Sequence, residues 1–418
     1  MSKTLMIKAM VLGAVACAFS ATGFAADVQN GHGQGIADPT TEVNGAKHEA
    51  VRSNWMDRTD IVVGVGMKDS KETHSQHHYV GESSMRHDDL HTVTSKSLKS
   101  TEFNKLYIET LQPITHYDEN AKSVVFVQGR IGRSGEKISS YKLDSYLEPA
   151  RPAGTFITHD KQTDTKESLG MNANIGIGYR RLSKGEHAYV GVNAFYDHVF
   201  KGGYKRVSGG VEYVAGLNEF HANLYRNLGT DDRKYIGLHG RSVVLGDPAG
   251  LYPYGMDPDQ SFYNYGIAAY ENHWMLSEKV AASGFDVGYS RTFKNARWAR
   301  VYADYYNWRG REAVRVGYYK LNKRDAIKGF NVGAEFHITP HLTLDAGYQT
   351  SSHHLSGPYA TLKYTIGTSK FAWRGGKHSE SVITTARSKM LDKVHRSDMV
   401  VQETVEDIYE QQFVDVGL

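Results

Sequence analysis

The sequence predicts an all-β protein, a twelve-stranded antiparallel β-barrel that spans a membrane. Three observations predict it: an N-terminal export signal, many segments in which apolar and polar residues alternate, and connections that are alternately short and long. Alternation with a period of two places one kind of side chain on each face of a strand. The chain has 418 residues, 42 glycines, 27 tyrosines and a net charge of +3. This composition suits an all-β architecture, and the near-neutral charge argues against nucleic acid as a partner.

The export signal occupies residues 1–25. Lys3 and Lys8 give it a positive start, and the apolar run that follows is too short to span a bilayer. We expect cleavage after Ala25, which leaves a mature chain without cysteine and a periplasmic N-terminal segment at 26–58. No later segment has the ~18 apolar residues of a membrane helix. Only helices and closed barrels satisfy their backbone groups inside lipid, so a membrane-spanning form of this chain would be a barrel.

Period-two alternation defines the barrel domain at residues 59–367. In one strand, Ile175 and Ile177 fall on the face assigned to lipid, and Asn172 and Asn174 fall on the other. A ten-residue strand rises about 33 Å, which is enough to cross the apolar band of a barrel when it is tilted. The predicted strands are 59–67, 103–112, 122–131, 170–181, 186–197, 204–214, 217–226, 282–292, 297–307, 330–338, 341–350 and 358–367.

The connections between these strands alternate in length. Residues 182–185, 215–216 and 339–340 are short, whereas 68–102 and 227–281 are long. Outer-membrane barrels have short periplasmic turns and longer external loops. A soluble periplasmic β-protein would show the same period of two, but it has no reason to place its long loops at one end. We therefore favour the barrel.

The polar face of each predicted strand lines the lumen. Charged side chains that face lipid cost about 2–4 kcal/mol near the bilayer midplane, so these residues should face water or one another. They could line a pore, or they could pair with one another and with a C-terminal helix, and we favour the paired interior. The predicted lumen residues are Asn172, Asn174, Arg180, Asn193, Glu212, Glu219, His221, Arg300, Asp304, Glu335, Asp345 and Lys363.

Several strings stand in order between residues 100 and 367, among them NANIGIGYRRL, VGVNAFYDHVF, YKRVSGGVEYV and ITPHLTLDAGYQ. In order and spacing they resemble the β-domain of the intimin/invasin family, the inverse autotransporters. Asn193–Asp197 is the most distinctive local match. The resemblance implies a twelve-stranded barrel with both ends in the periplasm. It also implies that the chain after the last strand re-enters the lumen and emerges outside.

Residues 368–396 are expected to form a lumenal linker helix, followed by a short passenger-like stub at 397–418. The string ESVITTARSKMLDKVHRSDMVV (Glu380–Val401) resembles the family's linker and is rich in helix formers. Twenty helical residues reach about 30 Å, one membrane thickness. The family normally continues into Ig-like repeats, for which the stub is too short, so we expect a vestigial passenger. The predicted plug residues are Arg387, Lys389, Asp392, Lys393 and Arg396.

The expected function is the display of surface segments for adhesion- or invasion-like contacts, from the outer membrane of a Gram-negative bacterium. Expected partners are outer-membrane lipid, the barrel-assembly machinery and a host-cell or surface receptor, with no nucleic acid and no cofactor. The long predicted connection 227–281 contains aromatic anchors among small polar residues, which suit a contact surface. This connection could instead fold over the barrel mouth. The predicted contact residues are Tyr252, Tyr254, Phe262, Tyr263, Tyr265 and Trp274.

Two further sets of residues carry chemistry in principle. His74, His77, His78, His87 and His91 could bind zinc or copper, but we favour a polar external loop and predict no metal site. Asp197 and His198, with Glu271 and His273, could activate water at the barrel rim. Nothing in the sequence fixes their distances, so we predict no enzyme. A channel with an open lumen is the main alternative function, and a rim hydrolase is the lesser one.

Overall fold

The computed structural model describes residues 55–417 apart from 81–86, 118–119, 151–154, 230–231, 245–264, 311, 313, 317–318, 322–323, 353–355 and 368–385. The predicted export signal and most of the segment 26–58 lie outside these residues. No helix in the described residues is long and apolar enough to cross a membrane.

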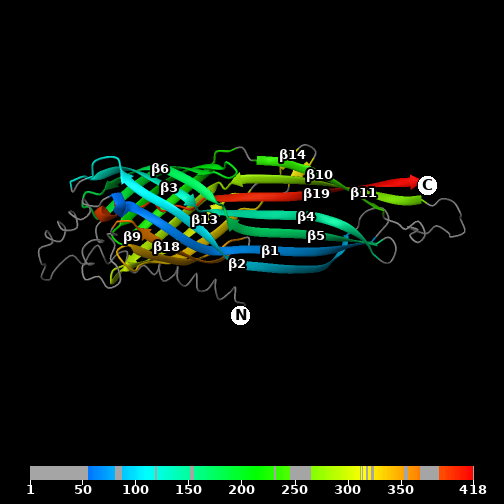
Figure 1. Cartoon of the computed structure of the whole chain (residues 1–418), viewed down its shortest axis with the longest axis horizontal. Coiled ribbons are helices and arrows are strands. Elements are labelled where there is room, and N and C mark those ends of the chain that lie inside the picture. The colour runs from blue at the N-terminus through cyan, green and yellow to red at the C-terminus, as the bar shows by residue number, and fades with distance from the viewer. Residues whose placement is uncertain are drawn as a thin grey trace.

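Twelve antiparallel strands close into a barrel (Figure 1). Closure is complete because β18 pairs with β1. The alternating pattern of the sequence predicted a strand at each of the twelve places, and all twelve are confirmed. The barrel strands are β1 (Thr59–Val80), β2 (His87–Pro113), β3 (Ser123–Arg133), β6 (Met171–Leu182), β7 (Ala188–Val199), β8 (Lys205–Ala215), β9 (Asn218–Asn227), β12 (Gly284–Phe293), β13 (Ala296–Trp308), β16 (Ile327–His337), β17 (Leu342–Gln349) and β18 (Gly357–Thr365).

The barrel has an apolar outside and a polar inside. In β6 every second residue is buried. Ile175 and Ile177 on the outer face are 59% and 51% exposed, while Asn172 and Asn174 are buried on the inner face. A soluble protein would bury the isoleucines, so this arrangement suits a barrel whose outer surface meets lipid.

The two ends of the barrel differ. At the turn end, short connections such as 183–187 and 216–217 join neighbouring strands, and Thr59 and Thr365 lie there too. The opposite end, here called the hairpin end, carries every long connection of the described residues. These connections contain strands rather than loops, because β1 and β2 run on as a ribbon past the barrel and further hairpins stand beside them. The additional strands are β4 (Glu136–Ala150), β5 (Thr155–Ser168), β10 (Asp232–Val244), β11 (Tyr265–Ala281), β14 (Val314–Val316) and β15 (Tyr319–Leu321).

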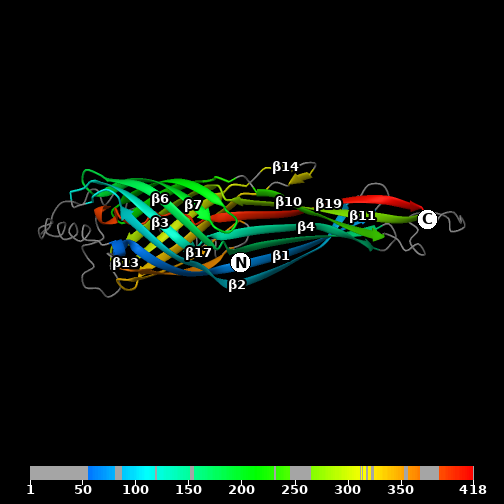
Figure 2. The same cartoon turned by 45° about the horizontal axis from the view of Figure 1, so that its top comes forward.

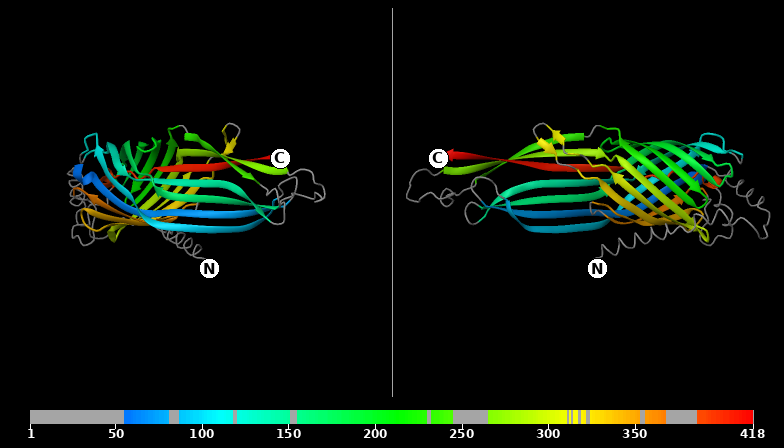
Figure 3. Two further views of the ribbon diagram at one scale, coloured as in Figure 1. Left: turned by 45° about the vertical axis from the view of Figure 1, so that its right-hand side comes forward. Right: turned by 180° about the vertical axis from the view of Figure 1, so that it is seen from behind.

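The sheet of the barrel continues past the hairpin end, and this outer part is here called the distal sheet (Figure 3). Its strand order is β2-β1-β5-β4-β19-β11-β10, where β19 (Val400–Gly417) is the C-terminal strand. β19 is parallel to β4 on one side and antiparallel to β11 on the other. The last strand of the described chain therefore lies between hairpins that come from two different parts of the barrel.

Inward-facing glycines make room for large side chains in the lumen. A Cβ added to Gly176 would meet the ring of Phe195 at 2.2 Å, and one added to Gly178 would meet Phe126 at 2.2 Å. Both rings belong to a buried apolar cluster at the turn end that also contains Ala386, Met390 and Leu391 of the C-terminal segment. The glycines thus leave space for the rings against which the C-terminal segment packs.

Candidate functional site: the occupied lumen

The C-terminal segment passes through the barrel from the turn end to the hairpin end (Figure 2). It begins with a 3-10 turn, η2 (Ala386–Lys389), where Arg387 bonds Glu186 of the β6–β7 turn at 2.9 and 2.8 Å. It leaves at the other end, where Asp398 meets Arg130 at 2.6 Å and the carbonyl of Met399 accepts from the amide of Glu136 at 3.0 Å. We call residues 386–399 the threaded segment.

The predicted helix is wrong over residues 386–396, because the chain has a 3-10 turn followed by a bend at 390–392 and no regular secondary structure after it. Residues 368–385 of the predicted helix lie outside the described residues. A chain outside helices covers up to about 3.3 Å per residue, against about 1.5 Å in a helix, so fewer residues are needed to cross the lumen. Side chains of the wall replace the hydrogen bonds of the helix. Arg180 Nη1 donates to the carbonyls of Met390 and Asp392 at 2.9 and 2.6 Å, and Gln128 Oε1 accepts from the amide of Val394 at 2.9 Å.

Near the hairpin end, Asp197 joins the wall to the threaded segment. Its carboxylate accepts from Arg206 Nε at 2.9 Å and from both terminal nitrogens of Arg396 at 2.7 and 2.6 Å. Arg206 also donates to the carbonyl of Ser397 at 3.1 Å. Arg206 is fully buried, and Asp197 and Arg396 are almost so. Charge-assisted bonds of this kind are about twice as strong as neutral ones, so this triad fixes both the position and the direction of the segment.

Between the Asp197 triad and the turn end, acidic residues of the wall hold basic residues of both the wall and the segment. Arg180 and Glu212 form a bidentate pair at 2.6 and 3.0 Å. Glu219 accepts from Lys389 of the segment at 2.6 Å and from Arg300 of the wall at 3.2 Å. Glu335 continues the series, since it pairs with Arg300 and with Lys363.

Beyond the barrel, an alternating row of charges crosses five adjacent strands of the distal sheet. Lys68 of β1 lies 3.8 Å from Glu167 of β5, which meets Lys137 of β4 at 2.7 Å. Lys137 reaches Glu403 of β19 at 3.2 Å, and Glu403 reaches Lys279 of β11 at 2.5 Å. Burial alone would raise the pKa of Glu403, but the hydrogen bonds and charges of Lys279 and Lys137 outweigh it, so the pKa is lowered. The C-terminal strand is thus held by charges as well as by backbone bonds.

The structure places the predicted lumen residues on the inner face of the barrel. Seven of them are buried: Asn172, Asn174, Arg180, Asn193, Glu212, Glu219 and Glu335. The other five are half-buried and lie around the same interior: His221, Arg300, Asp304, Asp345 and Lys363. Four of the predicted plug residues, Arg387, Lys389, Lys393 and Arg396, pair with wall carboxylates, and Asp392 offers its carbonyl to Arg180.

Sequence reasoning missed several partners of the threaded segment. Three of them lie on the polar face of their strands, so the alternation of apolar and polar residues could have identified them: Arg206, Asp286 and Arg130. Asp398 was missed because it was assigned to the stub rather than to the lumen. Asp286 Oδ2 accepts from the amide of Ser397 at 3.0 Å and from Tyr225 Oη at 2.6 Å.

The candidate residues outside the lumen do not form a site within the described part of the chain. Asp197 is buried on the inner face, whereas His198 stands in an aromatic row with Tyr196 and Phe200, so Asp197 and His198 project to opposite faces. His74 is exposed and bonds Glu72 at 2.8 Å. The described residues contain no group of three or more metal-ligating side chains.

The remaining candidates are placed in the following way. Tyr252, Tyr254, Phe262 and Tyr263 lie outside the described residues. Tyr265, Glu271, His273 and Trp274 are in β11, and His77, His78, His87 and His91 are in β1 and β2. For these eight residues the structure describes the backbone only.

Comparisons with known proteins agree with this architecture. The family model described as "Inverse autotransporter, beta-domain" matches residues 137–398. No curated protein matches the sequence.

Three solved structures illustrate the likeness in fold. A chain from a study of the in-meso crystallization of membrane proteins is 14% identical with a TM-score of 0.42, over 83% of this chain and 100% of that chain. The β-domain of the Bordetella autotransporter BrkA is 8% identical with a TM-score of 0.20, over 72% of this chain and 99% of that one. OmpF of Salmonella typhi, in complex with daunomycin, is 8% identical with a TM-score of 0.23, over 75% and 99%.

Proposed function

Because the chain belongs to the inverse autotransporter β-domain family, and is thus an outer-membrane barrel of a Gram-negative bacterium, we propose that it carries its own C-terminal segment through the lumen and presents it outside the cell. The hairpin end is then external, and the turn end is periplasmic. The distal sheet, with β19 between β4 and β11, becomes the displayed surface for adhesion- or invasion-like contacts. The family is one of non-enzymatic barrels, and we propose no catalytic activity.

One observation carries this proposal. The threaded segment enters beside the β6–β7 turn, where Arg387 meets Glu186, and leaves beside β4, where Met399 meets Glu136. Ion pairs with the wall hold it between these two points, as at Asp197 and Glu219. A buried charge that loses its partner costs several kcal/mol, so these pairs favour the threaded state over an empty lumen.

The orientation is tested with two epitope tags on cells that express the full chain. A tag after Leu418 should be labelled by antibody on intact cells. A matched tag within the β6–β7 turn, between Ser183 and Gly185, should be labelled only after the outer membrane is permeabilised. If the C-terminal tag is protected on intact cells while the turn tag is labelled, the proposed orientation is wrong.

The contact function is tested by deletion at the hairpin end. Removal of residues 250–270, which contain most of the predicted aromatic contact residues, should reduce binding of expressing cells to host cells or coated surfaces. A control deletion of Lys201–Gly203, in the short β7–β8 connection, should leave binding intact. Heat-modifiable migration in gels establishes that both variants are folded. Unchanged binding by the larger deletion would remove the assignment of contacts to this region.

A further inference from the structure

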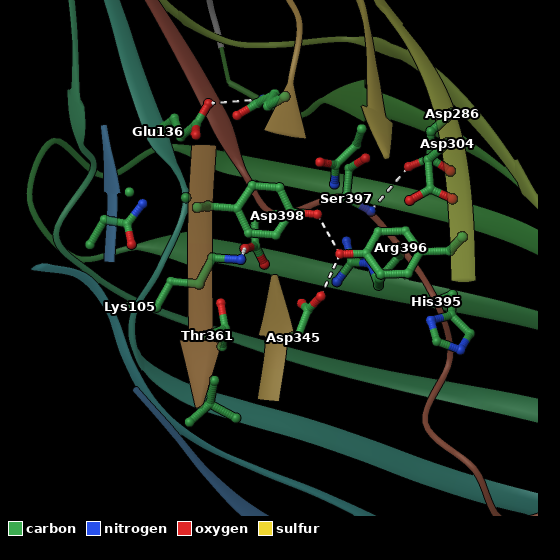
Figure 4. Close-up of a pocket in the computed structure, with 18 of the residues that line it drawn as sticks. Lys105, Glu136, Asp286, Asp304, Asp345, Thr361, His395, Arg396, Ser397 and Asp398 are labelled. Atoms are coloured by element: carbon green, nitrogen blue, oxygen red, sulfur yellow. Dashed lines mark hydrogen bonds and ion pairs between the residues drawn. The ribbon is translucent and has the colours of Figure 1, made fainter. Parts of the chain in front are cut away.

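The threaded segment fills one side of the lumen and leaves space on the other. Its apolar residues Met390, Leu391 and Val394 pack against a buried cluster that contains Phe126 and Phe195, on the β3–β7 side. On the opposite side lies a cavity of about 330 Å³. Strands β1, β2, β12, β13, β16, β17 and β18 form most of its lining with residues 393–400, and both acidic and basic side chains face it, among them Asp345 and Lys105 (Figure 4).

This cavity extends along most of the height of the barrel. Asp60 and Thr343 line it near the turn end, where β1 and β17 begin. Gln349 and Gly357 line it near the hairpin end, where β17 ends and β18 begins. A cavity of this volume has room for several water molecules.

The walls of the cavity carry buried polar atoms that lack partners among the described residues, and these are acceptor oxygens as well as the Nε donors of Arg300 and Arg396. Thr361 is only 7% exposed, and its Oγ1 has no hydrogen-bond partner. Asn331 Oδ1 and Asp304 Oδ1 are also buried without a hydrogen-bond partner, although Asp304 Oδ1 lies 3.6 Å from His221 Nε2. Asp345 accepts from Tyr302 Oη at 2.5 Å and has no cation within ion-pair distance in the described part of the chain. Buried oxygens of this kind are satisfied by water or by a cation.

Charged and polar side chains line the cavity near both of its ends. At the hairpin end, Lys166 meets Glu136 at 2.9 Å and Gln349 at 2.7 Å. At the turn end, Lys393 pairs with Asp60, and Lys363 meets Glu335 at 2.7 Å.

We propose that this cavity is a hydrated path for small cations beside the threaded segment, with Asp304 and Asp345 as the residues that favour cations. Carboxylates in a narrow, low-dielectric space concentrate ions of opposite charge. The proposal does not rest on the display function, because a barrel that displays nothing could conduct by this path and a barrel that displays could be sealed.

Planar bilayer recordings with the purified full chain provide the first test. We expect a small, steady conductance whose reversal potential in a KCl gradient has the sign of cation selectivity. The double substitution Asp304→Asn with Asp345→Asn should shift that potential toward zero. Asp164→Asn, in β5 of the distal sheet, is the control and should leave it unchanged. A full chain that does not conduct above the lipid background, or a double variant with unaltered selectivity, would overturn the proposal.

Thiol labelling provides the second test and does not require a current. The sequence has one cysteine, Cys17, which is replaced by serine in all variants. Thr361→Cys should react with a small cationic methanethiosulfonate and roughly tenfold more slowly with an anionic one of similar size. Ser208→Cys, on the filled side beside Arg396, should react with neither. Heat-modifiable migration establishes folding in each case. Absence of labelling at position 361, or equal rates for the two reagents, would show that the cavity is not a cation path.

Discussion

Asp197 connects two guanidinium groups of different origin, Arg206 of the barrel wall and Arg396 of the threaded segment. All three side chains are buried, so each charge depends on its partners rather than on water. The same aspartate had drawn attention as a rim residue that could activate water. Its two arginines and its separation from His198 point instead to a structural role.

Asp197→Asn is expected to destabilise the folded barrel by about 3–5 kcal/mol, because it leaves two buried arginines without a counter-charge. Urea unfolding in lipid vesicles, followed by tryptophan fluorescence, measures the loss. Glu72→Gln is the matched control. It removes a carboxylate that pairs with Lys161 and His74 in the exposed part of the distal sheet, and it should leave the midpoint unchanged. Equal effects of the two substitutions would contradict the role of the Asp197 triad.

Gly178→Ala is expected to cost about 1–3 kcal/mol, since a Cβ there would overlap the buried ring of Phe126 and force it to move. Gly129 is the control, because a Cβ at that position would have its nearest neighbour at an ordinary 3.7 Å. The same unfolding assay compares the two alanine variants. A smaller loss for Gly178→Ala than for Gly129→Ala would mean that the ring moves aside without cost.

Among the strands, β19 depends most on its neighbours, because it is joined to β4 and β11 rather than to a hairpin partner of its own. Glu403→Lys should place a third positive charge between Lys137 and Lys279 and weaken the capture of β19. Limited proteolysis on intact cells should then cleave the strand faster. Reversal of Lys279 alone (Lys279→Glu), which leaves the Lys137–Glu167 pair in place, should restore part of the protection to the Glu403→Lys chain. Failure of this rescue would show that the charge row does not hold the strand.

Acid should loosen β19 by the same mechanism. Folding lowers the pKa of Glu403, since its bonds to Lys279 and Lys137 outweigh the effect of burial. A carboxyl group of this kind contributes stability that is complete above its unfolded pKa of about 4.3 and is lost as the pH falls through the folded pKa. Protease protection of β19 should therefore be constant above about pH 5 and fall on further acidification. In the Glu403→Gln variant, protease protection of β19 should depend less on pH. An unchanged pH dependence would show that Glu403 is not the group that titrates.

The sequence allowed the barrel strands to be predicted, but not the distal sheet. Met171–Leu182 alternates strictly because one face meets lipid and the other the lumen. Lys71–Gln76 of β1 is polar at every position, so apolar and polar residues do not alternate there and the sequence does not indicate a strand. This segment is a strand because it pairs with β2 and β5. The threaded segment was predicted as a helix from its composition. Its non-helical form depends on donors such as Arg180 and acceptors such as Gln128, which are distant in sequence.

The barrel contains the threaded segment of its own chain. Ion pairs between the wall and this segment make the folded state of each depend on the other. Removal of residues 386–418 should leave Arg180, Arg206 and Glu219 without the groups that they bind in the segment. The truncated barrel should conduct far more than the full chain in planar bilayers, because the lumen then fills with water. It should also unfold at lower urea concentration. A truncated barrel with the conductance of the full chain would show that the threaded segment does not fill the lumen.

The position of β19 determines how the molecule responds to a mechanical load. A pull on the C-terminal end, away from the barrel, acts along the axis of β19. The hydrogen bonds to β11 lie across that axis, from Val401 opposite Ala281 to Gly417 opposite Tyr265. The load is therefore shared by many bonds in shear and is not applied to them one at a time, as it would be if the strand were peeled from its free end. Further inside, the Asp197 triad would have to break before the threaded segment could slide. The fold thus resists tension on its C-terminus along its whole length.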